Sequence, residues 1–280
     1  MLAFRFRLAS ILLASSLSPA LFASQDQAPA TIEVAPPKQS FVVTAIGDSI
    51  TRAYNADGFF KDAPWVSWST GERIIGGFES HLQKIAKRFP DRTMVTHNFA
   101  VTGARVADLK DQITKSGKDR PDYVTLMIGA NDVCSWSEDH HAALDNFKST
   151  LKGHLESITR SSPDVRIMMV PIPDMYRLYT LFRNRGSCLQ VWDFTGICKN
   201  LLHSSRTGAQ RASFRQRWVD ANTALEEVAG DFPQHVIFPK EVKDYEYKAT
   251  DVSSNDCFHP SIQGQNILSD LTWANGWYAH

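Results

Sequence analysis

Three residue types that together support nucleophilic catalysis lie far apart in the chain. The stretch "VVTAIGDSITRAYN" (residues 42–55) runs an apolar segment directly into Asp48 and Ser49. Near the C-terminus, "SSNDCFHPSIQGQ" places Asp256 and His259 three residues apart, so that both side chains can share one turn. A carboxylate in that position can accept the Nδ1–H of the imidazole, and Nε2 can then act as a general base towards a serine hydroxyl. These residues could therefore carry out acyl transfer at Ser49.

Each part of this set also has a simpler interpretation. A serine at the start of a helix is commonly an N-cap, and His259 could be a capping or surface residue. A D-x-x-H match arises by chance on the order of once in three chains of this length. Ser49 and the Asp256–His259 pair therefore need support from other segments.

Two further segments could supply the hydrogen-bond donors that such a nucleophile requires. In "NFAVTGARVADL" (residues 98–109), Gly103 lies in a loop before a helix, where a backbone N–H can approach a ligand closely. In "MIGANDVC" (residues 127–134), Asn131 follows a strand and carries an amide donor. Two donors near Ser49 would form an oxyanion hole. Both segments are also compatible with ordinary turns.

The apolar pattern predicts the elements that would position these residues. Strands are predicted at Phe41–Ile46, Met94–Asn98, Tyr123–Ile128, Val165–Pro171 and Val236–Phe238, with helices around residues 78–89, 144–158, 214–228 and from about 261. This alternation predicts an α/β fold, a three-layer α/β/α sandwich with a mostly parallel, about five-stranded sheet. Ligands of such a sheet bind beyond the carboxyl ends of its strands, which is where Ser49 and Asn131 fall.

The four segments together resemble the sequence blocks of the GDSL or SGNH hydrolase superfamily, whose fold is flavodoxin-like. The matching positions, in the superfamily's order, are Gly47-Asp48-Ser49, Gly103, Gly129-x-Asn131-Asp132 and Asp256-x-x-His259. The resemblance covers the chain from about residue 41 to residue 271. Within the superfamily, four segments are most similar in sequence to phospholipase B-like members: "PWVSWSTGE" (residues 64–72), "AVTGARVADL", "IGANDVC" and "DCFHPS".

The resemblance implies a serine esterase or lipase that works through an acyl-enzyme. Ser49 would be the nucleophile, His259 the base and Asp256 its orienting partner. The oxyanion would be bound by the backbone N–H groups of Ser49 and Gly103 and by the Asn131 side chain. This chemistry requires no metal and no organic cofactor.

Aromatic residues after the nucleophile favour a lipid substrate. They could line a cleft for the acyl chain of a phospholipid or lysophospholipid, with transient contact to a membrane or micelle, or they could pack as a small core over the sheet edge. The alternatives are a carbohydrate O-acetyl esterase of the same superfamily and, less favoured, a non-catalytic periplasmic binding protein on the same fold. The candidates are Phe59, Phe60, Trp65 and Trp68; Asp48 and Asp132 also match the superfamily and are interpreted as loop-ordering carboxylates.

The N-terminus predicts an exported protein, periplasmic or secreted. Residues 1–24 combine two arginines with a short apolar run and small residues, which is typical of a cleaved signal peptide. Residues 25–39 predict a Pro/Ala-rich tether, and residues 40–280 a single hydrolase domain with an irregular insertion around 174–206. Thirty basic residues balance thirty acidic ones without a basic cluster, so no nucleic-acid partner is expected.

Four cysteines in an oxidising compartment are candidates for two disulfides, with three possible pairings. Cys134 and Cys257 lie beside the predicted oxyanion and triad residues, so a working site should bring them close. We therefore predict a Cys134–Cys257 disulfide, with Cys188–Cys198 closing the insertion locally. No C-x-x-C pair occurs, and a zinc site is not expected.

Overall fold

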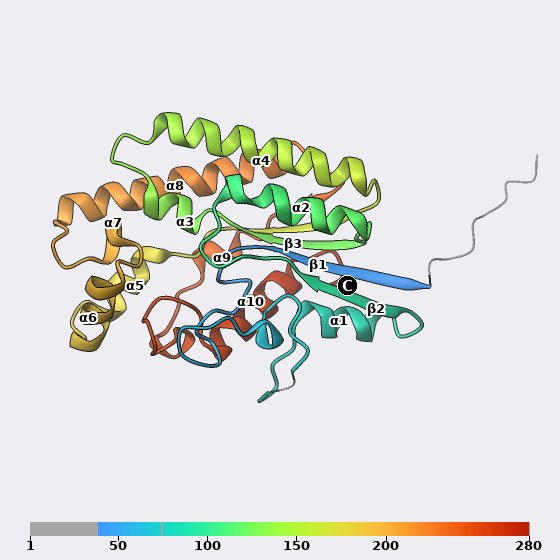
Figure 1. Ribbon diagram of the computed structural model, residues 1–280, viewed down its shortest axis with the longest axis horizontal. Coiled ribbons are helices and arrows are strands. Elements are labelled where there is room, and N and C mark those ends of the chain that lie inside the picture. Colours follow the sequence, from blue (N-terminus) through green and yellow to red (C-terminus); the bar gives the residue numbers. More distant parts are fainter. Residues whose placement is uncertain (1–38, 74, 280) are drawn as a thin grey trace, which may run out of the picture. The chain divides into compact units, whose positions relative to one another are not determined.

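The computed structural model describes residues 39–73 and 75–279 (Figure 1). The predicted signal peptide and all but the last residue of the predicted tether lie outside the described residues, and both stay predictions. In the part of the chain that is described, no helix is both long and apolar enough to cross a membrane.

A parallel sheet of five strands forms the centre of the fold, in the order β2-β1-β3-β4-β5. The strands are β1 (Ser40–Gly47), β2 (Thr93–Asn98), β3 (Tyr123–Met127), β4 (Arg166–Val170) and β5 (Val236–Ile237). Each coincides with a predicted strand, and the fold prediction is confirmed. β1 lies between β2 and β3, with Gly47 paired to Met127, so the segments that follow β1 and β3 leave the sheet side by side.

Helices cover both faces of this sheet, which gives the three layers. Figure 1 shows α2, α4 and α8 over one face and α1 and α10 over the other. Alternate residues of β3 serve the two sides: Val124 and Leu126 join the core beneath α4 and α8, while Tyr123 and Met127 join the core towards α1 and α10. The bounds are α1 (His81–Arg88), α2 (Leu109–Lys118), α3 (Ala130–Ser135), α4 (His141–Ser161), α8 (Gly208–Gly230), α9 (Glu241–Asp244) and α10 (Ile262–Ala274), with 3-10 turns at Pro64–Val66, Val106–Asp108 and Ala249–Asp251.

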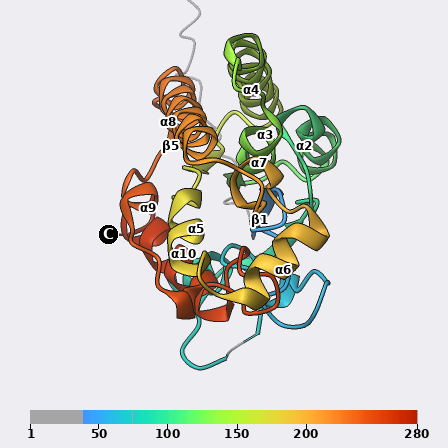
Figure 2. The same cartoon turned by 90° about the vertical axis from the view of Figure 1, so that its left-hand side faces the viewer.

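The segment expected to be an irregular insertion is helical instead. It consists of α5 (Met175–Phe182), α6 (Gly186–Thr195) and α7 (Lys199–Leu202), which Figures 1 and 2 place together near the end of the molecule where α3 also lies. The expectation was wrong because each helix is too short to display a convincing apolar period. Asp174 caps α5 through a hydrogen bond from the Arg177 N–H, and Gly196 ends α6 with a positive φ of 65°.

Candidate active site

Ser49, His259 and Asp256 form a continuous hydrogen-bonded chain. The Ser49 Oγ lies 2.8 Å from His259 Nε2, and His259 Nδ1 lies 2.6 Å from Asp256 Oδ2. All three residues are buried to at least nine-tenths, so the contacts are shielded from water. The arrangement allows His259 to remove the serine proton while Asp256 fixes the imidazole orientation.

The nucleophile is positioned by the turn that ends β1. Gly47 has a φ of +144°, and a Cβ there would lie 2.2 Å from the Met127 carbonyl oxygen, so the turn requires glycine. The Gly47 N–H donates to Gln112 Oε1 of α2, and the Ile50 N–H donates to Asp48 Oδ1. These bonds hold Ser49 at the carboxyl edge of the sheet.

The Asp256 carboxylate is held by four hydrogen bonds. Oδ1 accepts from the N–H groups of Phe258 and His259, while Oδ2 accepts from His259 Nδ1 and from Asn55 Nδ2 at 2.5 Å. Burial alone would raise the pKa of Asp256, but the hydrogen bonds and the charge of His259 outweigh it and lower the pKa. Asp256 therefore stays ionised as a partner for an imidazolium. Asn55 was not among the predicted site residues, and its only local signal is a residue type that tolerates its φ of +60°.

The predicted oxyanion residues lie across the same cleft from the triad. Ser49, Gly103, Asn131 and His259 line one hollow of about 260 Å³. Asn131 Nδ2 donates one hydrogen to the Ala104 carbonyl at 2.9 Å, and an amide nitrogen carries a second hydrogen for a ligand. The same bond ties Asn131 to the loop that carries Gly103, so the two donors are held relative to each other.

Two buried carboxylates, Asp48 and Asp132, lie beside the nucleophile and the oxyanion residue in the sequence. Burial raises the pKa of Asp48 to about 6 and that of Asp132 to about 7, and the nearby Asp48 charge adds to the shift of Asp132. Asp132 accepts the Val106 N–H at 3.1 Å, which fixes the end of the Gly103 loop. The Asp132 contact with Val106 and the Asp48 contact with Ile50 both agree with the predicted loop-ordering role of these carboxylates.

The sequence of this protein matches the GDSL-like lipase/acylhydrolase family over residues 45–267. The chain belongs to this family. Human membrane-associated phospholipase B1 is 25% identical over 299 residues, which are 90% of this chain but only 20% of that protein. The chain thus spans about a fifth of the length of this relative.

Solved structures share the fold at lower sequence identity. Phospholipase A1 from Streptomyces albidoflavus has a TM-score of 0.51 at 16% identity, covering 85% of this chain and 100% of that one. An acetyl xylan esterase from Geobacillus stearothermophilus also has a TM-score of 0.51, at 18% identity, covering 85% and 95%. At these identities the likeness shows a common GDSL hydrolase fold and leaves the substrate open.

The aromatic residues predicted to bind substrate fall in different places. Phe60 lines the catalytic cleft, and Phe59 packs edge-on against it with 65% of its surface exposed. Trp65 lies outside the cleft and donates from Nε1 to Asp57. Trp68 is fully buried against His81. The substrate-binding prediction is therefore wrong for Trp68, which is a core residue, and the cleft does not include Phe59 or Trp65.

The α6 segment contributes to the GDSL site in a way that the sequence did not suggest. Trp192 Nε1 donates to the Asp256 carbonyl at 3.1 Å, so a helix supports the loop that carries Asp256 and His259. Residues that the sequence did not single out also line the cleft together with the triad. They are Tyr54, Thr102, Thr195, Ile197 and Phe258, and the disulfide cysteines Cys134 and Cys198 line it as well.

The disulfide pairing differs from the predicted one. Cys134 is bonded to Cys198, and Cys188 is bonded to Cys257. The prediction failed because Cys188 lies near the start of α6 and Cys198 beyond its end. The helix from Cys188 to Thr195 alone extends about 10 Å, whereas a disulfide joins Cα atoms less than about 7 Å apart. The Cys188 bond instead fastens α6 to the loop that carries Asp256 and His259, and the Cys198 bond fastens the start of α7 to α3, which carries Asn131.

In the described part of the chain, no group of three or more His, Cys, Asp or Glu side chains is placed to hold a metal ion. The chemistry of the cleft is that of a serine, a histidine and hydrogen-bond donors.

Proposed function

We propose that this protein hydrolyses acyl esters of lipids, phospholipid or lysophospholipid, through Ser49, His259 and Asp256. The observation that carries the proposal is the 2.8 Å contact from Ser49 Oγ to His259 Nε2 inside a cleft that also contains Gly103 and Asn131. Nucleophile, base and oxyanion donors then surround one reacting carbon.

The proposed reaction proceeds in two steps. Ser49 Oγ attacks the ester carbonyl as its proton moves to His259 Nε2, and the oxyanion is stabilised by the N–H groups of Ser49 and Gly103 and by Asn131 Nδ2. The C–O bond to the alcohol breaks, and His259 returns the proton to that alcohol. Water, deprotonated by His259, then cleaves the acyl-enzyme and regenerates Ser49.

Exposed aromatic side chains on two sides of the cleft support a lipid substrate. Phe60 lines the cleft and, with Phe59, leaves large rings in solvent, at 45% and 65% exposure. Phe194 is 90% exposed and immediately precedes Thr195, which lines the cleft. Rings in these positions suit transient contact with a membrane or micelle surface. The similarity to a membrane-associated phospholipase B1 points the same way.

The proposal includes export to an oxidising compartment. Two disulfides beside the site suit the periplasm or the extracellular medium, where such bonds persist. N-terminal sequencing of protein recovered from the periplasm or medium of an expressing cell tests this point. A first residue near position 25 is expected, and recovery of the full chain from the cytoplasm alone would contradict it.

A hydrolysis panel tests the reaction and the substrate together. Wild-type protein and Ser49→Ala are compared on p-nitrophenyl esters, phospholipid, lysophospholipid and acetylated xylan, with products identified in each case. We expect release of fatty acid from the lipids by wild type and none by Ser49→Ala. Activity confined to acetyl esters and acetylated glycan would favour a carbohydrate O-acetyl esterase, and retained activity in Ser49→Ala would remove the proposed nucleophile.

A further inference from the structure

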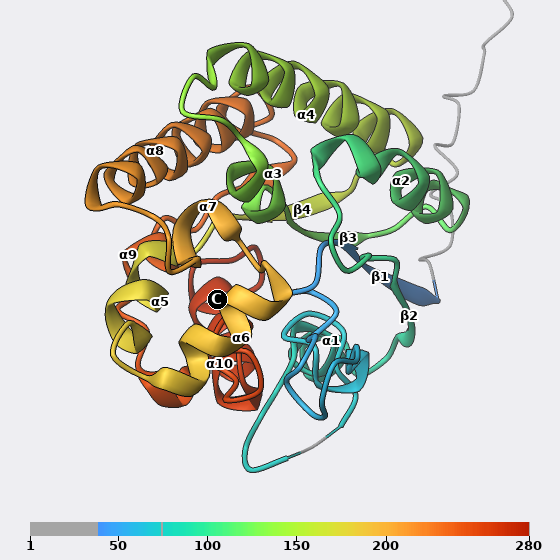
Figure 3. The same ribbon diagram turned by 60° about the vertical axis from the view of Figure 1, so that its left-hand side comes forward.

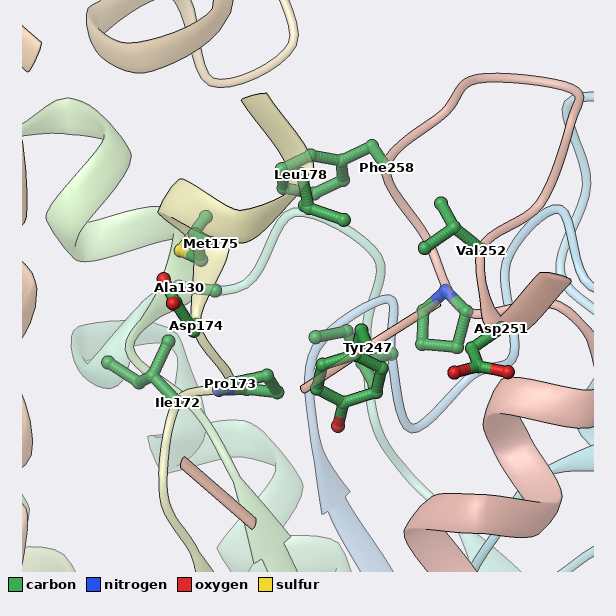
Figure 4. Close-up of a pocket in the computed structure, with 12 residues that line it drawn as sticks. Ala130, Ile172, Pro173, Asp174, Met175, Leu178, Tyr247, Asp251, Val252 and Phe258 are labelled. Carbon is green, nitrogen blue, oxygen red and sulfur yellow. The ribbon is translucent and has the colours of Figure 1, made fainter. Parts of the chain in front are cut away.

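A second, smaller pocket shares the Phe258 side chain with the catalytic cleft. Figure 4 shows it between the start of α5, with Met175 and Leu178, and the segment that carries Val252 and Phe258. It has a volume of about 40 Å³, against about 260 Å³ for the open cleft. The proposed mechanism assigns nothing to this pocket.

The lining of this pocket is adjacent in sequence to the reacting groups. Ile50 follows the nucleophile, Ala130 precedes the oxyanion residue Asn131, and Phe258 and Pro260 flank the base. Phe258 belongs to the linings of both the pocket and the cleft. Phe258, which is half-buried, is therefore shared by the two linings, and the lining of the pocket includes residues next in sequence to Ser49 and His259.

The surface that this pocket presents to a ligand is apolar. Its two carboxylates are already engaged by the chain, since Asp174 accepts the Arg177 N–H and Asp251 accepts the Lys248 N–H. Figure 4 shows the Tyr247 hydroxyl and the Asp251 carboxylate directed away from Phe258 and Leu178. Aliphatic and aromatic carbon therefore forms most of the remaining wall, which suits a hydrocarbon chain better than a sugar hydroxyl.

We infer that this pocket binds the acyl chain of the ester, with Phe258 as the partition between chain and leaving group. This inference rests on the proposed function, because it assumes an acyl-enzyme at Ser49. The alcohol must stay within reach of His259 Nε2, and the open cleft with Thr102 and Thr195 provides room for its polar groups. The acyl chain occupies the apolar pocket, which it enters when the Phe258 ring rotates.

The size of the pocket sets the expected chain length. Its volume is room for about three water-sized groups, so roughly the first three or four carbons of the acyl chain fit before the wall must move. Each buried methylene then raises kcat/KM by roughly threefold to fourfold up to that length, and further carbons add little.

Substitutions at Leu178 test the inference in both directions. Leu178 lies on α5, well away in sequence from the triad, and is buried in the pocket wall. In Leu178→Trp, the ratio of kcat/KM for hexanoyl over acetyl p-nitrophenyl ester should fall about tenfold. In Leu178→Ala, the ratio for decanoyl over hexanoyl ester should rise about tenfold, because the vacated space accepts more chain. The second variant keeps the test decisive if the first does not fold.

A matched control and a second substrate series separate this inference from the proposed function. Leu181→Trp makes the same change three residues further along α5, outside the pocket, and should keep the wild-type profile. Alkyl acetates of increasing alcohol length should show no dependence on Leu178. A wild-type acyl profile in Leu178→Ala, or a change in the alcohol series instead, would overturn the acyl assignment while acetyl ester hydrolysis still supported the triad. Absence of acetyl ester hydrolysis in the wild type would instead count against the proposed function.

Discussion

The loop after β1 and the α5–α7 segment support the same catalytic loop by different means. The first carries Ser49 and reaches Asp256 through Asn55, with tight turns and hydrogen bonds to near neighbours. The second carries no member of the triad, yet it holds the Asp256–His259 loop through the Cys188–Cys257 bond and the Trp192 hydrogen bond. Figure 3 shows α5, α6 and α7 gathered on one side of the molecule. One region supplies reacting groups, and the other supplies their alignment.

The two regions should therefore respond differently to substitution. Changes to the loop after β1 should remove chemistry and leave the fold, because a single hydroxyl or carboxylate is involved. Changes to the helical segment should weaken both alignment and stability, because its contacts bridge separations of 64 and 69 residues. The predicted effects below run from reacting groups to supporting ones.

The largest effect is expected for Ser49→Ala. Loss of the nucleophile should lower kcat on a short p-nitrophenyl ester by on the order of 10⁵–10⁶, because no other group can form the acyl-enzyme. The thermal unfolding midpoint should stay within a few degrees of wild type, since only one buried hydroxyl is removed. Stoichiometric labelling of wild type, and not of Ser49→Ala, by an organophosphonate provides an independent check.

Asp256→Asn should come next. The amide can donate to His259 Nδ1 and so stabilise the wrong tautomer, which should lower kcat by about 10⁴ at neutral pH. Asn55→Ala removes only one of the four hydrogen bonds to the same carboxylate and should lower kcat far less. Rates within tenfold of wild type in Asp256→Asn would show that Asp256 is structural.

Asn131→Ala should have a smaller effect on the same reaction. Loss of one oxyanion donor typically lowers kcat by roughly 10²–10³ with little change in KM. Because Asn131 also binds the Ala104 carbonyl, circular dichroism and a melting curve must accompany the kinetics. An unchanged kcat in a folded variant would remove Asn131 from the oxyanion hole.

The sheet and its long helices could be predicted from the sequence because their signals are local. Five apolar runs became five parallel strands, and the long helices α4 and α8 display their apolar period over many residues. The short helices α5, α6 and α7 do not, since they have only eight, ten and four residues, which is fewer than three turns each. Their positions are determined by tertiary contacts.

The residues of the candidate site also divide into those that a local motif predicts and those that it does not. Ser49 and His259 are 210 residues apart, yet their motifs identified them as partners. Asn55, Trp192 and the disulfide pairing belong to no recognisable motif, so only the folded chain places them. Trp68 was predicted to bind substrate but is a core residue. Sequence could not decide between the two, because a large aromatic residue near a nucleophile is as compatible with the core as with a cleft.

A pH effect is predicted for the carboxylates beneath the oxyanion loop. Burial raises the pKa of Asp132 to about 7, so the folded protein holds a proton that the unfolded chain releases near pH 4. That contribution to stability is present below pH 4 and is lost as the pH rises through about 7. Between pH 5 and 8, the free energy of unfolding of wild type should therefore fall by on the order of 2 kcal/mol relative to Asp132→Asn. Urea titrations at both pH values measure this, with the surface variant Asp139→Asn as control, and a pH-independent difference would contradict the shift.

The smallest effect, and the one that best separates scaffold from chemistry, is expected for Trp192→Phe. The change keeps a buried ring but removes the hydrogen bond to the Asp256 carbonyl, which should cost about 1–3 kcal/mol of stability. Looser support of the triad should lower kcat by about threefold to tenfold with KM nearly unchanged, because substrate contacts are intact. Trp68→Phe is the matched control, since Trp68 is equally buried and its Nε1 has no hydrogen-bond partner among the described residues. Equal losses of kcat in both variants would mean that Trp192 only fills the core, whereas a loss confined to Trp192→Phe would show that α6 positions the catalytic loop.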